Sequence, residues 1–462
     1  MSSFAGLLPF GLFLLAILIV SLTTEYYFPH VTALPEEESY KGIIIKDPKL
    51  DLKVVFQGLK KPSSMAFLGQ NDILVLQKDN GTVQRIVNGT MLLNPLLDVN
   101  VATQIERGML GIAVGKHGDT NGKPTYVYVY FTEAKTGDGQ NTSNKNDVLG
   151  NRLYRYELVD NKLVNPKLLL EVPSPRPLHN GGSLIIGPDN NLYLIAGDGG
   201  RYWGNSTEAH NNKNGTYPDG TSAIYRITQD GKLVEPSIFG GKDPLNKYYA
   251  YGIRNSFGLD FDPVTGNLWD TENGPGFGDE INLVEPGFNS GWGKIQGIWE
   301  RSPLDASRVG EIASPNREGL VDFQGKGKYS SPEFTWKQTE GVTSLEFFNS
   351  DKLGKQYEND LFVSDFVNGY LYHFDLNKKR NELLLNGTFS DKIVDRHKDL
   401  QNITLGQGFG GITDMEVGPE GYLYILSLQQ GGGDCGASLS SRDCVQYSSP
   451  VVGTIYKIVP KS

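Results

Sequence analysis

Short apolar runs alternate with turn residues along most of the chain. Residues 126–131 show apolar side chains in alternation, and 192–195 (Leu-Tyr-Leu-Ile) are continuously apolar. Both patterns are typical of strands with one or two buried faces. Long helical periodicity is nearly absent. The sequence therefore predicts an all-β protein.

Three stretches look like copies of one hairpin: GPDNNLYLIAGD, DPVTGNLWDTENG and GPEGYLYILS. A strand, a tight turn and a second strand, repeated along the chain, are typical of β-propeller blades. Six such units are found, at 65–87, 109–156, 178–227, 258–283, 344–374 and 414–458. They predict a six-bladed β-propeller, although the loose repeat length also allows one blade more or fewer. We expect residues 53–56 to pair into the last unit, because a closed ring leaves no free sheet edge.

The N-terminus has a different composition. Residues 4–23 are almost entirely apolar, which is long enough to span a bilayer as a helix. A basic n-region and a small-residue cleavage site are not clear, so an uncleaved anchor is favoured over a cleaved signal peptide. We predict a transmembrane anchor or signal segment at 1–24, a polar stalk or linker at 25–50 and the propeller at 51–462. Either use of the first segment places the propeller outside the cytoplasm, membrane-anchored or secreted.

Two further features favour an extracytoplasmic glycoprotein. Asn-x-Ser/Thr sequons occur at Asn80, Asn88, Asn141, Asn205, Asn214, Asn386 and Asn402. The two cysteines, Cys435 and Cys444, are expected to form a disulfide in an oxidising compartment. The formal net charge of −10 argues against a nucleic-acid partner, because no basic surface is available to bind phosphates.

His179 is the first candidate for chemistry. It stands between a Pro-rich approach and two glycines, and Asp198 ends the strand that follows. An imidazole held by a carboxylate is a competent general base near neutral pH. The alternatives are a structural histidine and an aspartate that caps a turn.

Two more stretches carry candidate ligands. Arg254 and Asn255 offer several hydrogen-bond donors that suit carbonyl or carboxylate oxygens. The alternative is that Arg254 has a structural role and holds adjacent blades together. In 272–280 the glycines let backbone carbonyls converge, and Asp279 and Glu280 add hard oxygen ligands that suit calcium. The alternative for this stretch is a turn with surface acids.

Together, HNGGSLIIGPDNNLYLIAGDGG, YGIRNSFGLDFDP and ENGPGFGDEINLVEPGFNSGWG closely resemble the glucose/sorbosone dehydrogenase family. RGMLGIAV and GTIYKI are similar to family elements too, and the resemblance covers roughly 51–460. It implies a six-bladed quinoprotein that uses pyrroloquinoline quinone (PQQ) and calcium. His179 would take the substrate's hydroxyl proton while hydride passes to the quinone, and Asp198 would support it. Arg254 and Asn255 would contact the quinone oxygens.

The resemblance also implies metal ligands. Gly274 and Pro275 would offer backbone carbonyls to the calcium that holds the cofactor. Asp279 and Glu280 would serve a neighbouring calcium.

Several cofactor positions depart from the family pattern. The family often has glutamine where this chain has Glu106, and Trp203 stands where another glutamine is expected. A lysine is replaced by Val367, and an Arg-x-Arg pair by residues 411–413. PQQ carries three carboxylates, so the changes at Val367 and at 411–413 remove cations that would bind it. Substitute cations are available in Arg176, Arg201 and Lys337.

The sequence thus predicts an extracytoplasmic quinoprotein dehydrogenase that oxidises a small sugar or alcohol and passes electrons to an unknown acceptor. The main alternative is a non-redox cell-surface propeller that binds carbohydrate or protein. A calcium-dependent hydrolase is a weaker alternative, because no nucleophile and base pair is recognisable.

Overall fold

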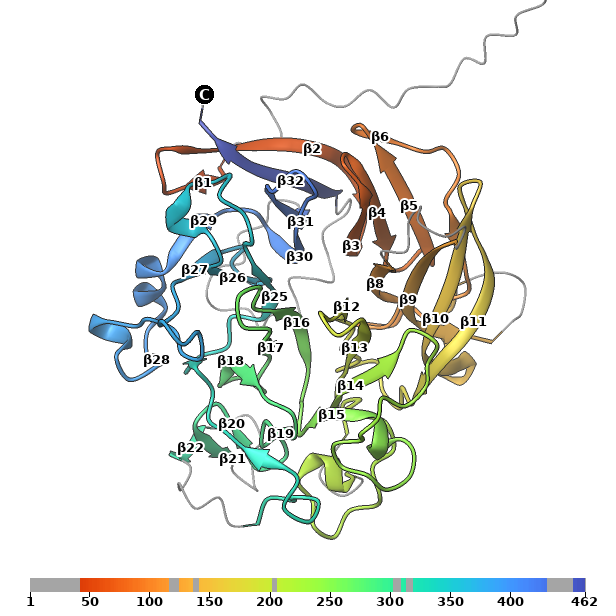
Figure 1. The fold of residues 1–462 in the computed structure, drawn as a ribbon, viewed down its shortest axis with the longest axis vertical. Helices are drawn as coiled ribbons and strands as arrows, with labels where there is room; N and C mark the ends of the chain where they lie inside the picture. The colour runs from red at the N-terminus through yellow and green to blue at the C-terminus, as the bar shows by residue number, and fades with distance from the viewer. Residues whose placement is uncertain are drawn as a thin grey trace, which may run out of the picture.

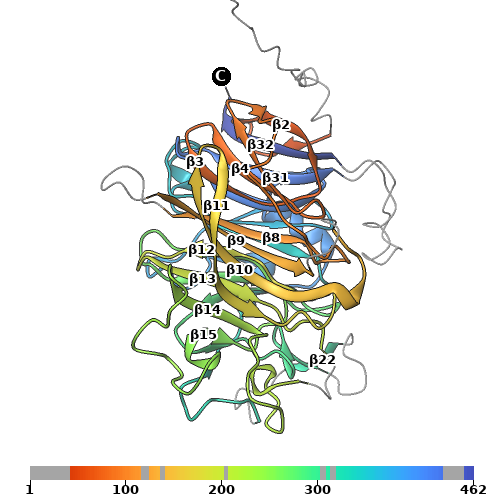
Figure 2. The same ribbon diagram turned by 90° about the vertical axis from the view of Figure 1, so that its right-hand side faces the viewer.

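The computed structural model describes residues 42–115, 124–135, 141–201, 206–301, 309–312, 319–429 and 452–461. These residues form an all-β propeller, as predicted, with strands arranged around a common centre (Figure 1). Six sheets of four or more strands are present in the described part of the chain. Figure 2 shows the same sheets from the side.

Six innermost strands contact one another in a closed ring: β3 (Pro62–Gly69), β8 (Met109–Gly115), β12 (Leu184–Ile186), β16 (Ser256–Phe261), β25 (Val342–Phe347) and β30 (Gly411–Val417). Each innermost strand starts one sheet, and the later strands of that sheet lie progressively farther out.

The first three sheets follow in chain order. The first adds β4 (Asp72–Gln77), β5 (Thr82–Val87), β6 (Thr90–Met91) and β7 (Leu97–Asp98). The second adds β9 (Thr125–Ala134), β10 (Val148–Val159) and β11 (Lys162–Val172). The third adds β13 (Asn191–Ala196), β14 (Ala223–Thr228), β15 (Tyr248–Tyr251), β19 (Phe288–Asn289) and β23 (Lys328–Tyr329).

The other sheets are less uniform. The fourth adds β17 (Leu268–Glu272), β18 (Asp279–Val284), β24 (Phe334–Trp336) and β28 (Ile393–Val394). The fifth adds β26 (Leu361–Asp365), β27 (Leu371–Phe374), β29 (Thr404–Gln407) and β1 (Ile44–Ile45), and the sixth adds β31 (Leu423–Gln429), β32 (Val452–Pro460) and β2 (Leu50–Lys60). A small sheet of β20 (Ile295–Gln296), β21 (Trp299–Arg301) and β22 (Val309–Ile312) is separate. Short 3-10 helices are η1 (Lys145–Asp147), η3 (Glu208–His210), η4 (Leu245–Lys247), η5 (Lys355–Tyr357), η6 (Gly387–Phe389) and η7 (His397–Asn402).

The ring closes as the sequence predicted. β2 pairs antiparallel with β32, with Lys53 opposite Lys457 and Val54 opposite Tyr456. An N-terminal strand therefore completes the last sheet and covers its edge. Part of the segment predicted as a stalk also joins the propeller, since Ile45 in β1 pairs with Gly406 in β29 and packs against an apolar cluster.

The turns of the three similar hairpins share a left-handed residue near their end, although the middle turn is one residue longer. In each, the residue just before the second strand or one position earlier has a positive φ: Asn190 (63°), Gly266 (74°) and Gly421 (85°). Asparagine and glycine tolerate this left-handed conformation best, which explains their recurrence at these positions. The strand residues that follow, such as Leu194 and Leu426, are completely buried.

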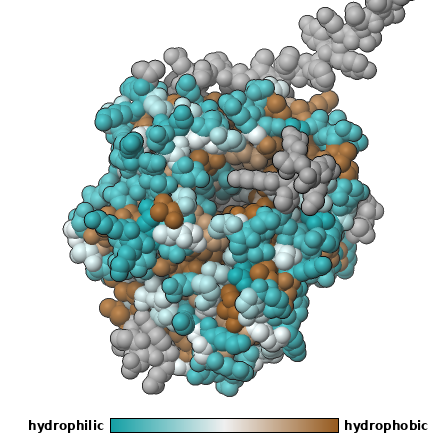
Figure 3. Space-filling view, in the orientation of Figure 1, coloured by the Kyte–Doolittle hydropathy of each residue, from teal (hydrophilic) through white to brown (hydrophobic). Residues whose placement is uncertain are grey.

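Parts of the sequence prediction fall outside the described residues. These are the apolar segment at 1–24, Cys435, Cys444 and Trp203. Among the residues that are described, no helix is both long and apolar enough to cross a membrane. The face seen in Figure 3 is largely hydrophilic with scattered apolar patches.

Candidate active site

His179 and Asp198 meet at the end of one hairpin. His179 precedes β12 and Asp198 follows β13, so the antiparallel pairing of these strands brings the two residues together. The Nδ1 atom of His179 lies 2.6 Å from Oδ1 of Asp198. A Cβ at Gly197 would lie 2.3 Å from the carbonyl oxygen of His179, so a glycine is required for this close approach. The prediction that Asp198 orients His179 is thus supported by direct contact.

Asp198 is buried but well supplied with donors. Its Oδ1 accepts a hydrogen bond from the Gly200 N–H at 2.7 Å, and its Oδ2 accepts one from Nε1 of Trp292 at 2.6 Å. Burial alone opposes ionisation, but the charge and hydrogen bond of His179, with smaller contributions from other nearby cations, lower the pKa of Asp198 to about 2. A permanently ionised carboxylate fixes the Nδ1–H tautomer of the imidazole.

Glu106 and Asn255 bind the backbone of the loop that carries His179. One Glu106 oxygen, Oε2, accepts hydrogen bonds from the His179 N–H at 2.7 Å and from Nδ2 of Asn255 at 3.2 Å. The Oδ1 atom of Asn255 in turn accepts the Gly181 N–H at 3.2 Å. Both residues were predicted to contact a cofactor, which stays a prediction; in the structure they fix the backbone around His179.

Arg254 lies beside this pair. Its N–H donates to Oε1 of Glu272 at 2.7 Å, and its Nη1 donates to the Asn273 carbonyl at 2.7 Å. Nε of Arg254 is buried without a hydrogen-bond partner among the described residues. Burial lowers the pKa of Arg254, and the negative charges of Asp198 and Glu106 oppose this effect.

The loop 274–280 is folded around its own acids. Asp279 accepts three backbone N–H groups, from Gly274, Glu340 and Gly341, each at 2.8 Å. Burial raises the pKa of Asp279 to about 6 despite these donors. Pro275, next in this loop to Gly274, is half-buried.

Glu280 is also directed into the protein, where Gln296 donates to its Oε1 at 2.9 Å and Asn282 to its Oε2 at 3.0 Å. Its pKa is raised well above the ordinary value by burial first and by the charge of Glu272 second. Because both carboxylates bind groups of the protein itself, their role as calcium ligands stays a prediction.

Trp292 is the main residue that sequence reasoning missed. Its indole contacts two guanidinium groups, with the Cζ of Arg301 at 4.0 Å and that of Arg254 at 5.2 Å from the ring centroid. Cation–π contacts of this kind hold both cations beside Asp198. Trp292 belongs to the third quoted motif, but nothing in its spacing indicates a contact with an aspartate far away in the chain.

Comparison with known proteins assigns the chain to a family. The sequence profile described as glucose/sorbosone dehydrogenase matches residues 59–434, which is most of the chain. The chain belongs to this family.

Named relatives and solved structures agree with the family. The quinoprotein glucose dehydrogenase B of Acinetobacter calcoaceticus is 29% identical over 65% of this chain and 64% of its own length. The aldose sugar dehydrogenase of Escherichia coli is 27% identical over 55% of this chain and 58% of its own. The matched stretch thus spans less than two thirds of either relative. The PQQ-bound aldose sugar dehydrogenase of Streptomyces coelicolor superposes with a TM-score of 0.58 at 21% identity, covering 89% of this chain and 98% of that one, and so shares the fold.

The family's quinone cofactor fits this site in part. The buried, unpaired Nε of Arg254 is a donor that a carbonyl oxygen would satisfy, and the donors of Asn255 lie next to it in the chain. The positions of the missing cations hold Val367, 46% exposed, and Thr413, whose hydroxyl donates to the Leu426 carbonyl. Two substitute cations are engaged elsewhere, Arg201 with Asp219 and Lys337 with Asp395. The site therefore has donors for the quinone oxygens of PQQ but lacks cations for its carboxylates.

Proposed function

We propose that the protein is an extracytoplasmic dehydrogenase that oxidises a hydroxyl group of an aldose or related alcohol, on a propeller with one blade for each of the six strands of its inner ring. The observation that supports this proposal most strongly is the 2.6 Å contact between Nδ1 of His179 and the buried carboxylate of Asp198. Membership of the glucose/sorbosone dehydrogenase family supports the same reaction class.

In this proposal His179 is the general base. Because Nδ1–H donates to Asp198, the lone pair of the neutral ring is on Nε2, which forms no hydrogen bond with the described residues. Nε2 takes the proton of the substrate hydroxyl, and the negative charge of Asp198 stabilises the imidazolium that results. The His179 side chain is 15% exposed, so the base is accessible yet shielded from bulk water.

Arg254 and Asn255 are the residues that would hold PQQ, with the Gly274 and Pro275 carbonyls offered to a calcium ion that neutralises a cofactor carboxylate. When bound, PQQ accepts the hydride that the substrate carbon releases. Arg254 is held rigidly by Glu272, Asn273 and Trp292, so its free N–H needs no rearrangement to meet an acceptor. Glu106 adds a negative charge where the family often has a neutral glutamine, which weakens the site for an anionic cofactor.

The replaced cations favour a second candidate, a propeller without redox activity that binds carbohydrate or protein at the cell surface. Val367 and Thr413 leave the carboxylates of PQQ without two of their expected partners. A charge-assisted hydrogen bond contributes about 1.5–3 kcal/mol, so the two losses together amount to a large decrease in affinity.

Dye-linked oxidation of a panel of sugars by the full-length protein, with and without PQQ and calcium, separates the two functions. We expect turnover only when both are added. The PQQ concentration needed for half-maximal activity should be at least tenfold lower in the double variant Val367→Lys, Thr413→Arg than in the parent. A matched Val367→Gln, Thr413→Gln variant controls for side-chain size. No oxidation of any sugar by the parent and the cationic variant would overturn the proposed enzyme and favour the binding protein.

A further inference from the structure

A second histidine cluster lies in the fifth sheet, far from His179 in the chain. His373 lies within β27, Asp360 directly precedes β26 and Asp375 directly follows β27. Since β26 and β27 are antiparallel neighbours with Phe362 opposite His373, the three side chains converge at one end of this strand pair. One atom of each side chain, two carboxylate oxygens and one imidazole nitrogen, lies within 4.8 Å of the others.

The imidazole is fixed in place by its neighbours. Its ring packs edge-on against Tyr357, with 5.0 Å between the ring centroids, and at a tilt against Phe362, with 5.2 Å between the centroids. Nε2 of His373 then lies 2.9 Å from Oδ2 of Asp360 and 3.8 Å from Oδ1 of Asp375.

Two carboxylates share this one imidazole. A single carboxylate is enough to pair with a histidine, and among the described residues no lysine or arginine forms an ion pair with Asp360 or Asp375. The cluster therefore carries excess negative charge that a cation would neutralise.

The backbone holds the carboxylates in this arrangement. The Asp360 N–H donates to the Tyr357 carbonyl at 3.1 Å, and the Asp375 carbonyl accepts the Leu384 N–H at 2.8 Å. Asp375 thus stays close to Asp360 although its side chain is 60% exposed.

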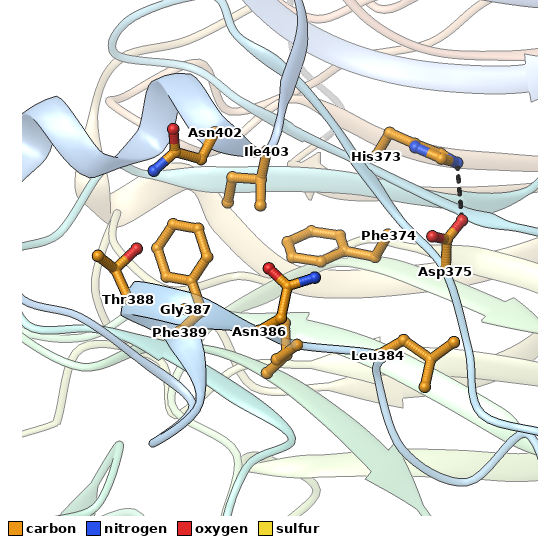
Figure 4. Close-up of a pocket in the computed structure, with 11 residues that line it drawn as sticks. His373, Phe374, Asp375, Leu384, Asn386, Gly387, Thr388, Phe389, Asn402 and Ile403 are labelled. Atoms are coloured by element: carbon orange, nitrogen blue, oxygen red, sulfur yellow. Dashed lines mark ion pairs between the residues drawn. The ribbon is translucent and has the colours of Figure 1, made fainter.

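The cluster borders a cavity of about 450 Å³. His373 and Asp375 lie together at one end of the side chains drawn in Figure 4, whereas Thr388 and Asn402 lie at the other. The cavity gives solvent and a small ion access to the cluster.

We propose that Asp360, His373 and Asp375 bind a divalent transition-metal ion of the zinc class. Zinc takes histidine nitrogen and carboxylate oxygen at about 2.0–2.2 Å, so two tetrahedral ligands lie roughly 3.4 Å apart. The observed separations of 2.9 and 3.8 Å lie on either side of this value. An imidazole ligand favours zinc over calcium, which prefers oxygen ligands alone. The ion ties the hairpin after β27 to the start of β26, and a water completes its coordination.

Titration of the full-length protein with zinc chloride, followed by calorimetry, tests the proposal. We expect one equivalent of zinc to be bound by the parent, and the affinity for it to fall at least tenfold in Asp375→Asn and in His373→Gln. Cobalt(II) gives a second readout, since its visible absorption reports a tetrahedral site with nitrogen and oxygen ligands. His397→Gln is the matched control, because His397 pairs with one carboxylate, Glu340 at 3.2 Å, and it should leave the affinity unchanged.

Asp375 is exposed, so Asp375→Asn is expected to fold, which circular dichroism verifies. Equal zinc affinity and stoichiometry in the parent, Asp375→Asn and His373→Gln would place the ion elsewhere and overturn the proposal. Absence of zinc binding by the parent would overturn it as well.

Discussion

The molecule contains two histidine–aspartate pairs whose surroundings differ. In the His179–Asp198 pair the aspartate is 1% exposed and its oxygens also accept N–H groups from Gly200 and Trp292. The His373–Asp360 pair has no such donors in the described residues and instead contacts a second carboxylate, Asp375. The first arrangement keeps one negative charge satisfied by donors and leaves Nε2 free for a proton. The second gathers more negative charge than the imidazole balances. The neighbours of the pair, and not the pair itself, thus distinguish a base from a metal ligand.

Removing each imidazole tests this comparison with the largest expected effect. His179→Ala should lower kcat by roughly two to four orders of magnitude, because a general base contributes that much. The thermal midpoint should fall as well, because the buried carboxylate of Asp198 loses its imidazole partner, but the folded fraction that remains should show the same low kcat.

The matched control is His373→Ala, measured by the same dye-linked assay. It should retain the kcat of the parent, because His373 lies in a different sheet from the proposed base. Unchanged turnover in His179→Ala would remove this histidine from the mechanism and make the two pairs equivalent.

The donors around Asp198 provide a second test. Trp292→Phe removes the N–H bonded to Oδ2 of Asp198 at 2.6 Å and keeps an aromatic ring beside Arg301 and Arg254. A hydrogen bond to a charged group contributes about 1.5–3 kcal/mol, so we expect kcat to fall about 10- to 100-fold. The acid limb of the pH–rate profile should shift as well, because the carboxylate that holds the imidazolium is altered.

Trp269→Phe is the control for this variant. The indole N–H of Trp269 is buried and has no hydrogen-bond partner in the described residues, so its loss removes no contact with Asp198. If both tryptophan variants change kcat and the pH profile alike, Trp292 contributes through packing alone and has no positioning role.

The hairpin pattern explains what the sequence predicted well. His179 and Asp198 flank one hairpin, and the turn at Asn190 and the strand pairing are local features. The family resemblance then placed Arg254 and Asn255 beside them. Closure by β2 was predictable because an unpaired apolar strand at the start of a propeller has one sheet edge to cover.

Contacts between sheets were not predictable in the same way. Trp292 reaches Asp198 across 94 positions of the chain, and Asp375 meets Asp360 because of the exact packing at a strand end. The loop 274–280 shows the same limit. Its composition indicates acidic ligands, but whether Asp279 points outward or accepts neighbouring N–H groups depends on the tertiary position of Glu340 and Gly341.

The pH dependence of stability gives the smallest effect and contrasts the signs of the two sites. The pKa of Asp198 is lowered from 3.8 to about 2, so Asp198 stabilises the folded protein above pH 4 and this stabilisation is lost as the pH falls towards 2. Asp198→Asn should therefore lower the free energy of unfolding at pH 7 by about 2 kcal/mol and flatten its decrease between pH 4 and 2.

The pKa of Asp375 is raised, so its ionisation in the folded state opposes folding as the pH rises above 3.8. Asp375→Asn should leave stability at pH 7 unchanged or increase it by less than about 1 kcal/mol, because the group is exposed. Urea unfolding from pH 2 to 7, with chelator present to exclude metal, measures both variants. Equal losses of stability at pH 7 in the two variants would show that the two aspartates have the same environment and contradict the comparison.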